Sequence, residues 1–395
     1  MKQSGFLYKS TALLPYTFFI LAIGLVPILY QPYADFVKYA LFIFAPIYLY
    51  LHQSRDNFYS NCRDLAHFLR PWSIWYIGIV TLILVHGVSG NSTLLNAFVM
   101  MCLLFLVLST ISFHREQVLW GISLNVILFS ILILAYVFCY GLGSSVLGIN
   151  KNRIIPEMTI LGCVCFITFV FEREKYSKKL RNTLLTATFF MLASIVVTEV
   201  RTALLGILAI GPLLLFSKNA SSRKYFLVFC ATLFVACTLF WMTGRLQEGL
   251  VDLTKYEAGN PNTSWGLRIE FWKLATAGFL EKPLLGWGYK PFHNLLASGF
   301  TFPVPSITKI PHFHSDYFTQ LVSYGLVGIT TWLITIFLLY KSSKNDPARL
   351  SIILSTLAMG VSDRIWHYNS TSILLIMFSW VLLYLSEKKI TSKRV

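Results

Sequence analysis

The sequence predicts an all-α integral membrane protein with about twelve transmembrane helices. Of its 395 residues, 56% are hydrophobic and only 13% are charged, whereas a soluble domain has about 25% charged residues. Long apolar runs recur along the chain, and basic residues gather in alternate short segments between them. A chain with so few polar groups cannot cover its surface in water, so lipid must cover it instead.

The individual spans follow from the apolar runs, because a helix needs about 20 mostly apolar residues to cross a bilayer. The seventh and eighth runs form a tight pair around Glu199 and Arg201. The N-terminal segment 1–10 is short and basic, and the apolar run that follows it has no small-residue cleavage site. We therefore expect an uncleaved first span. The predicted spans lie near 11–30, 36–52, 72–88, 94–112, 118–140, 156–172, 183–200, 201–217, 225–243, 316–340, 350–366 and 369–386.

The orientation follows from the distribution of basic residues, which favours the cytoplasmic side in short loops. Basic residues are concentrated in the segments 53–70, 173–181, 218–224, 341–349 and 388–394. Both termini are therefore expected in the cytoplasm. The chain then divides into helices 1–9 (1–243), a large periplasmic loop (244–315), and helices 10–12 with a cytoplasmic tail (316–395).

The large loop is expected to contain one amphipathic helix over 265–281. Trp265, Ile269, Trp272 and Phe279 fall near one face at helical spacing. Such a helix either lies in the membrane interface or packs on the transmembrane bundle, and the pattern fits both arrangements.

Composition and motifs also argue against several function classes. The net charge of +16 suits anionic membrane lipids better than nucleic acid, since the basic residues follow the topology. The sequence contains no GxxxxGK[ST], GxGxxG or HExxH motif, so it indicates no nucleotide or metal cofactor. Cys163 and Cys165 lie inside an apolar run without zinc-site spacing, which favours buried small hydrophobic residues.

Candidate functional residues gather on the predicted periplasmic side. Ionisable groups at the ends of spans are unfavourable in lipid and therefore mark functional sites. Arginines from separate helices bind phosphate with planar, bidentate contacts, and a histidine among them can exchange a proton near neutral pH. Taken singly, each residue also fits a non-catalytic role, such as contact with a lipid headgroup. The candidates are Arg153, Arg201, Arg268, His314, Asp316, Asp363 and Arg364.

Several of these residues lie in motifs that resemble those of lipopolysaccharide O-antigen ligases. His314-Ser315, followed after nine residues by GLVG, resembles the H[NSQ]-x9-Gxx[GTY] motif of this family. The run RTALL from Arg201 resembles its Rx3L motif. Arg268 followed by EKPLLGWG resembles the R…P…GxGx stretch of the periplasmic loop, and GVSD, ending at Asp363, resembles a segment before the last span. The resemblance covers roughly 150–370.

The resemblance implies a GT-C-like fold in the inner membrane of a Gram-negative bacterium. It implies transfer of a glycan from undecaprenyl diphosphate to lipid A–core, without a metal or nucleotide. In that scheme His314 is the general base, and Arg201 and Arg268, with Arg153 as a third, bind the diphosphate. Asp316 or Asp363 would orient His314 or an arginine. Ser315 is expected to cap the following helix, and Gly325 and Gly328 to allow close helix packing.

Two other functions remain open. An O-antigen polymerase of the same superfamily would use the same donor but elongate the glycan. A polyprenyl-glycan transporter would instead require charged residues along a path through the bilayer. Because the spans are nearly free of charge and the ionisable residues gather on one side, the pattern favours an enzyme, and the His-Ser-x9-GxxG motif favours the ligase.

Overall fold

A computed structural model describes residues 55–86, 114–217, 220–304, 312–365 and 379–386, except positions 144, 148 and 289, together with residues 102, 105 and 106. The predicted spans near 11–30 and 36–52, and most of the span near 94–112, lie outside the described residues. So does the first half of the last span, of which residues 379–386 are helical.

The described part of the chain is almost entirely helical, which confirms the predicted class of an all-α membrane protein. Five helices are long and apolar enough to cross a membrane: α5, α6 with η1, α7, α10 and α14. The helices are α3 (Arg55–His86), α5 (Arg115–Tyr140), α6 (Lys151–Glu172), α7 (Lys178–Thr198), α8 (Arg201–Leu208), α9 (Gly211–Leu215), α10 (Ala220–Met242), α11 (Arg245–Glu257), α12 (Ser264–Glu281), α13 (Pro291–Ala297), α14 (Asp316–Ser343) and α15 (Pro347–Gly360).

Two small elements interrupt this helical pattern. The 3-10 helix η1 (Arg173–Lys175) follows α6. The strands β1 (Ser145–Val146) and β2 (Ile149–Asn150) form a short antiparallel hairpin before α6, in which Ser145 faces Asn150. The side chain of Asn150 accepts a hydrogen bond from the N–H of Asn152 and so caps α6. Helix α6 therefore begins five residues before the predicted span and includes Arg153 in its first turn.

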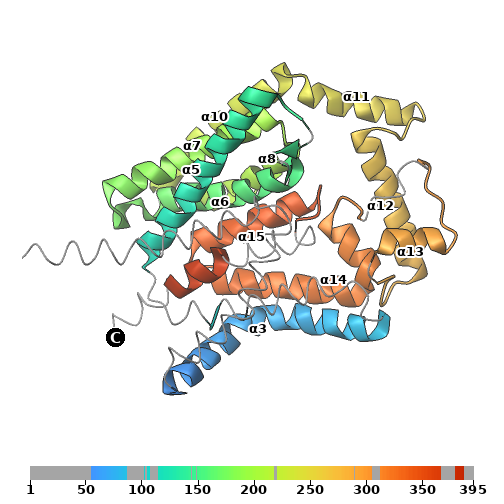
Figure 1. The fold of residues 1–395 in the computed structure, drawn as a ribbon, viewed down its shortest axis with the longest axis horizontal. Helices are drawn as coiled ribbons and strands as arrows, with labels where there is room; N and C mark the ends of the chain where they lie inside the picture. Colours follow the sequence, from blue (N-terminus) through green and yellow to red (C-terminus); the bar gives the residue numbers. More distant parts are fainter. Residues whose placement is uncertain are drawn as a thin grey trace, which may run out of the picture.

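The long helices pack side by side as a bundle, and the segment 244–304 lies at one end of it (Figure 1). Helix α15 packs against α6 and α8, α14 packs against α3, and α5 packs against α7. Helices α11, α12 and α13 follow one another along that end, and α12 contacts α14. The chain therefore brings α8, α11, α12, α14 and α15 together around one end of the bundle.

Buried ion pairs hold the opposite end of the bundle. Arg115 at the start of α5 donates to both carboxylate oxygens of Glu172 at the end of α6 and to both of Asp346 before α15, at 2.8–3.0 Å. Arg349 donates to Asp346 as well (2.9 Å). Because these groups are buried, each carboxylate needs its guanidinium partners to remain charged away from water. The network fixes the ends of three helices relative to one another.

A sharp corner joins α7 to α8. Glu199 lies in the left-handed conformation (φ +55°) at the end of α7, and only Val200 separates it from Arg201. This confirms the predicted tight pair. The predicted single span over 201–217 is interrupted, however, because the helix breaks at 209–210 before the short α9. Gly211 follows this break directly, and Pro212 lacks the N–H of a continuous helix.

A backbone break divides α14 near its N-terminal end. Gly325 has φ +60° and ψ −156°, a region that only glycine populates readily. The loop 282–288 fills the break by exchanging backbone hydrogen bonds with α14, so Gly325 serves to open the helix rather than to allow the predicted helix–helix packing. The bonds run from Trp287 to Val322, Gly288 to Ser323, Leu326 to Pro283 and Val327 to Leu284, at 2.8–3.2 Å.

Helix α12 packs on the bundle, which favours one of the two arrangements left open by the sequence. Thr263 caps its N-terminus by accepting from Gly266 N–H (3.0 Å). Its buried face contains Phe271 and Leu274, and Trp272 stacks on Phe318 of α14 with a centroid distance of 5.5 Å. The expected helix therefore forms, but the predicted face of Trp265, Ile269, Trp272 and Phe279 is only partly buried and is not the face that packs in the core. The segment also contains α11 and α13, whereas the sequence predicted a single helix. The packing of α12 fixes Arg268 relative to the start of α14.

Candidate active site

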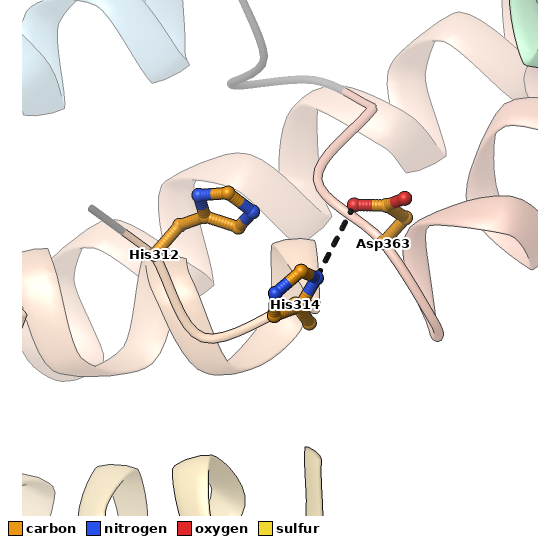
Figure 2. A group of neighbouring side chains, drawn as sticks. All are labelled: His312, His314 and Asp363. Atoms are coloured by element: carbon orange, nitrogen blue, oxygen red, sulfur yellow. Dashed lines mark ion pairs between the residues drawn. The ribbon is translucent and has the colours of Figure 1, made fainter. Parts of the chain in front are cut away.

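His314 lies at the end of the bundle where α14 begins. Its backbone adopts the left-handed conformation (φ +48°), an unfavourable state for a non-glycine residue that is typical of functional sites. The side chain remains 28% exposed, and its Nδ1 atom lies 3.8 Å from Oδ1 of Asp363. Figure 2 shows this pair, with the imidazole ring turned toward the carboxylate. The distance makes it an ion pair when His314 is protonated, but it is longer than a hydrogen bond.

Two aspartates hold the loop that follows α15. Asp363 accepts from the N–H of Arg364 (2.8 Å), and Asp316 accepts from the N–H of Ile365 (2.8 Å). Burial opposes the charge on Asp363, but its interactions with His314 and Arg364 N–H outweigh burial and keep the pKa of Asp363 below its ordinary value. Asp363 is thus the aspartate beside His314, while Asp316 fixes the loop.

Ser315 also ties the start of α14 to the end of α15. It occupies the predicted N-cap position, but its hydroxyl makes no capping bond. Instead it donates to the carbonyl of Gly360 (3.3 Å). The prediction was therefore right about the position of Ser315 and wrong about its hydrogen bond, because the neighbouring helix offers an acceptor that the sequence alone does not reveal.

A second histidine lies against the first. The ring centroids of His312 and His314 are 4.5 Å apart, and Figure 2 shows the two rings side by side. His312 is buried. Burial lowers the pKa of His312 well below its ordinary value, and the positive charge of Arg364 lowers it further. His312 therefore stays neutral at neutral pH, whereas the more exposed His314 is the one open to a substrate.

Arg268 joins α12 to the loop that carries Asp363. Its Nη1 donates to the backbone oxygen of Ser264 (2.9 Å) and to the Ser264 hydroxyl (2.7 Å), and its Nε donates to the carbonyl of Ser362 (3.4 Å). Burial lowers the pKa of Arg268, and the negative charge of Asp363 opposes this shift. Arg268 is therefore a positioned guanidinium next to the His314–Asp363 pair, and a guanidinium keeps its charge in proteins.

Arg201 is the first residue of α8 and lies in the same cluster. Its charge interacts with those of Arg245 and Arg268. Within the part of the chain that the structure describes, its guanidinium makes no hydrogen bond and no ion pair. The carboxylates of Asp252 and Glu248 also act on its charge but form no ion pair with it, so this half-buried guanidinium beside two others favours binding of an anion.

Arg245 was not among the residues predicted from the sequence. It begins α11 and pairs with Glu199 (3.9 Å) and with Glu248. Its charge also acts on Arg201 and Arg268. The only signal in the sequence is its place directly after a predicted span, on the side where the other candidates gather.

The remaining predicted residues have different surroundings. Arg153 forms an ion pair with Glu157 of the same helix (3.6 Å). The charge of Arg364 acts on His312. Among the predicted residues, Arg201, Arg268, His314 and Asp363 thus form the centre of the cluster, with Asp316 and Arg364 supporting its loop.

His312, His314 and Asp363 also have the composition of a metal site. One potential ligand atom from each lies within 4.8 Å of the others. The positive charges of Arg364 and Arg268 both act on His312, and such charges repel a divalent cation. The same charges attract phosphate, so the donor set fits an anionic substrate better than a metal ion.

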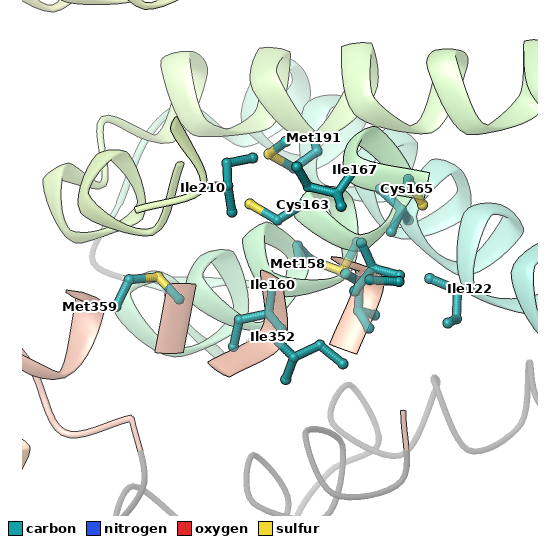
Figure 3. Packing of buried hydrophobic residues seen from close by; sticks show 14 of the residues in the cluster. Ile122, Met158, Ile160, Cys163, Cys165, Ile167, Met191, Ile210, Ile352 and Met359 are labelled. Atoms are coloured by element: carbon teal, nitrogen blue, oxygen red, sulfur yellow. The ribbon is translucent and has the colours of Figure 1, made fainter. Parts of the chain in front are cut away.

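An apolar cavity lies among α6, α7, α10 and the α8–α9 junction. Its volume is about 540 Å³, which is within the usual range for ligand pockets of about 300–1,000 Å³. Cys163, Met191 and Ile210 are among its lining residues, and Figure 3 shows these three side chains within the packed hydrophobic core. Ile207 lines it as well and follows Arg201 by six residues, about 9 Å along a helix. The cavity thus begins about two turns below the cationic end of α8.

Comparison with known proteins adds a family to this geometry. A family model described as O-antigen ligase matches residues 186–333, from within α7 to within α14. No curated protein matches the chain. The matched region contains Arg201, Arg268 and His314, which lie in the motifs that resemble the ligases. Over this region, which is less than half of the chain, the protein is similar to the O-antigen ligase family.

Proposed function

We propose that this protein is an O-antigen ligase of a Gram-negative inner membrane. It transfers a glycan from undecaprenyl diphosphate to lipid A–core on the periplasmic face, with both termini in the cytoplasm. The observation that carries this proposal is the convergence of two guanidiniums, Arg201 and Arg268, beside the His314–Asp363 pair. This combination supplies what a lipid-diphosphate leaving group and a sugar nucleophile require.

The reaction is a direct displacement at the anomeric carbon of the donor sugar. A hydroxyl oxygen of the acceptor forms the new glycosidic bond, and the bond to the phosphate oxygen breaks, so the lipid diphosphate leaves with the electron pair. His314 accepts the proton of the hydroxyl, and Asp363 stabilises the imidazolium that forms. Attack from the face opposite the leaving group inverts the anomeric configuration.

Two catalytic effects divide between the residues. A positioned general base such as His314 contributes about 10²–10⁴-fold to a rate. A fixed donor directed at developing charge contributes about 10²–10³-fold, which is the role proposed for Arg268. No nucleotide or metal is needed, since the bond to the diphosphate is already activated and the arginines stabilise the departing charge.

The apolar cavity fits the lipid part of the same donor. A polyprenyl chain attached to a phosphate at Arg201 would pass along α8 and reach Ile207 and Ile210, which line the cavity. We propose that the cavity holds the first isoprenoid units of the donor. This would keep the diphosphate at the level of the arginines while the rest of the chain extends into the bilayer.

The test is transfer by the purified protein in vesicles that contain a lipid-linked glycan donor and rough lipopolysaccharide. His314→Ala should abolish transfer while leaving thermal stability unchanged. His293→Ala is the matched control, because His293 is exposed on α13 outside the cluster. Transfer should also persist in the presence of a chelator. Normal transfer by His314→Ala would contradict the proposed mechanism.

A deletion strain separates the ligase from the polymerase. Loss of a ligase leaves rough lipopolysaccharide and long glycan still on the carrier lipid, whereas loss of a polymerase leaves a single repeat unit on the core. The proposal predicts the first pattern, and the second would assign the protein to elongation.

A further inference from the structure

Two donor groups outside the His314–Asp363 pair converge on one glycine of α11. An added Cβ atom at Gly249 would lie 2.8 Å from Nη1 of Arg201 and 3.3 Å from the indole Nε1 of Trp265. Both nitrogens therefore lie directly over the backbone of α11 at a position without a side chain. Gly249 is buried in the middle of the helix, and its φ is not in the left-handed region, so the helix itself does not require glycine here.

Neither donor is used by the described part of the protein. The indole N–H of Trp265, like the guanidinium of Arg201, makes no hydrogen bond among the described residues. Trp265 is only partly buried, so a ligand can reach it. Indole N–H and guanidinium groups are donors only, and their common partner must be an acceptor such as a phosphoryl oxygen.

Arg268 links this pair of donors to the catalytic residues. Its guanidinium lies 5.9 Å from the centroid of the Trp265 ring, and its charge interacts with that of Arg201. On its other side it donates to Ser362, next to Asp363. The order in space is therefore Trp265 with Arg201, then Arg268, then Asp363 with His314.

This order gives the bound donor a direction. We propose that the indole N–H of Trp265 and the guanidinium of Arg201 form a phosphate subsite over Gly249 that binds the phosphate attached to the lipid. Arg268 then binds the phosphate attached to the sugar, whose anomeric carbon faces His314. This inference rests on the proposed function and deepens it, because it separates the two phosphates of the donor.

The two subsites should have different kinetic roles. The bond that breaks joins the sugar to its own phosphate, so most new charge develops at Arg268. The phosphate attached to the lipid gains less charge in the transition state. A contact that is equally strong in the ground state and transition state changes KM and leaves kcat unchanged. Loss of the Trp265 N–H should therefore raise the KM for the donor.

Trp265→Phe is the direct test, because phenylalanine keeps an aromatic ring for Arg268 and lacks the N–H. Loss of one hydrogen bond to a charged group should raise the donor KM about tenfold or more with little change in kcat. Trp272→Phe is the matched control on the same helix, since the Trp272 ring stacks on Phe318 and its Nε1 has no hydrogen-bond partner. A wild-type donor KM in Trp265→Phe would overturn the proposal.

Gly249→Ala tests the same subsite by changing the backbone position against which Arg201 and Trp265 lie. The new methyl group would displace Arg201 and Trp265, both of which are side-chain ends, so the fold should tolerate it. Alanine is also a better helix former than glycine, and thermal stability should not fall. The donor KM should rise as in Trp265→Phe, whereas Leu250→Ala, at an exposed neighbour on α11, should change neither property. Unchanged KM in Gly249→Ala would contradict the geometry.

Product inhibition tests which part of the donor the subsite binds. It also distinguishes failure of this inference from failure of the proposed function. Undecaprenyl diphosphate should inhibit the wild type more strongly than undecaprenyl monophosphate or inorganic diphosphate, and Trp265→Phe should reduce that advantage. Equal inhibition of the two proteins by every compound would refute the phosphate subsite. Absence of transfer by the wild type would instead refute the proposed function.

Discussion

Replacement of Gly325 by alanine should disrupt both the fold and the candidate site. The backbone at Gly325 is held open by the loop 282–288, which lies between the end of α12 and the start of α13. An added Cβ atom would lie 2.4 Å from the carbonyl oxygen of Leu284. Since that neighbour is backbone rather than a flexible side chain, relief of the clash requires the loop to move.

The size of the effect follows from two contributions. A non-glycine residue in this region of φ and ψ costs about 1–3 kcal/mol. Movement of the loop would break the bonds from Leu326 to Pro283 and from Val327 to Leu284, each worth about 0.5–1.5 kcal/mol. The total loss in free energy of unfolding is about 2–6 kcal/mol. Because the loop joins Arg268 on α12 to α14, transfer activity should fall as well.

The assay is thermal unfolding of the detergent-purified protein, followed by transfer in vesicles. Gly299→Ala is the matched control, since Gly299 also has a positive φ (+95°) but an added Cβ meets no atom within 4 Å. It reports backbone strain without the clash. If Gly325→Ala unfolds at the same temperature as Gly299→Ala and retains activity, the break in α14 does not have the role assigned to it.

Four further predictions test other parts of the molecule. His312→Asn should reduce the stability that the protein loses between pH 7.5 and pH 5. Burial keeps the pKa of His312 in the folded protein below its ordinary value. As the pH falls through about 6.5, only the unfolded chain therefore gains this proton, which destabilises the wild type. The measurement is unfolding temperature against pH, and no change relative to wild type would contradict it. Asp346→Ala should lower the free energy of unfolding by about 3–5 kcal/mol, because it removes the buried carboxylate that Arg115 and Arg349 share; denaturation that matches wild type would argue against the network. Ala236→Trp fills the apolar cavity and should raise the KM for a long polyprenyl donor but not for a two-unit prenyl donor, and equal effects on both would exclude the cavity as the lipid site. Arg201→Met should raise the unfolding temperature while transfer is lost; a lower unfolding temperature would mean that Arg201 stabilises the fold.

The fold was predictable from the sequence where hydropathy alone decides the structure. The helices near 118–140, 183–200 and 316–340 match α5, α7 and α14 within a few residues, because each apolar run is long enough to span lipid. The breaks were not predictable in the same way. The α8–α9 break occurs inside an apolar run, and the role of Gly325 depends on a loop forty residues earlier in the chain, which no local pattern specifies.

The residues of the candidate site could be predicted from the sequence, but the pairs that they form could not. Arg201, Arg268 and His314 were identified by residue chemistry and motif, and the structure brings them to one end of the bundle. The sequence did not distinguish Asp316 from Asp363 as the partner of His314, since both lie near spans. It also gave Arg153 more weight than Arg245, because the pairing of Arg153 with Glu157 depends on helix α6 starting earlier than predicted.

The arrangement of charge explains why Arg201 should reduce stability and still serve the proposed binding of an anion. Arg201 and Arg268 both interact with Arg245 and with each other, and like charges at partly buried positions repel more strongly than in water. Arg245 and Arg268 have acceptors among the described residues, whereas Arg201 has none. Burial and the two neighbouring guanidiniums therefore act against its charge more strongly than Asp252 and Glu248 favour it, until an anion binds. Removing the charge relieves that repulsion in the free protein, and the same change removes the attraction that holds the diphosphate. Higher stability together with lost transfer is the combination that separates a binding residue from a structural one.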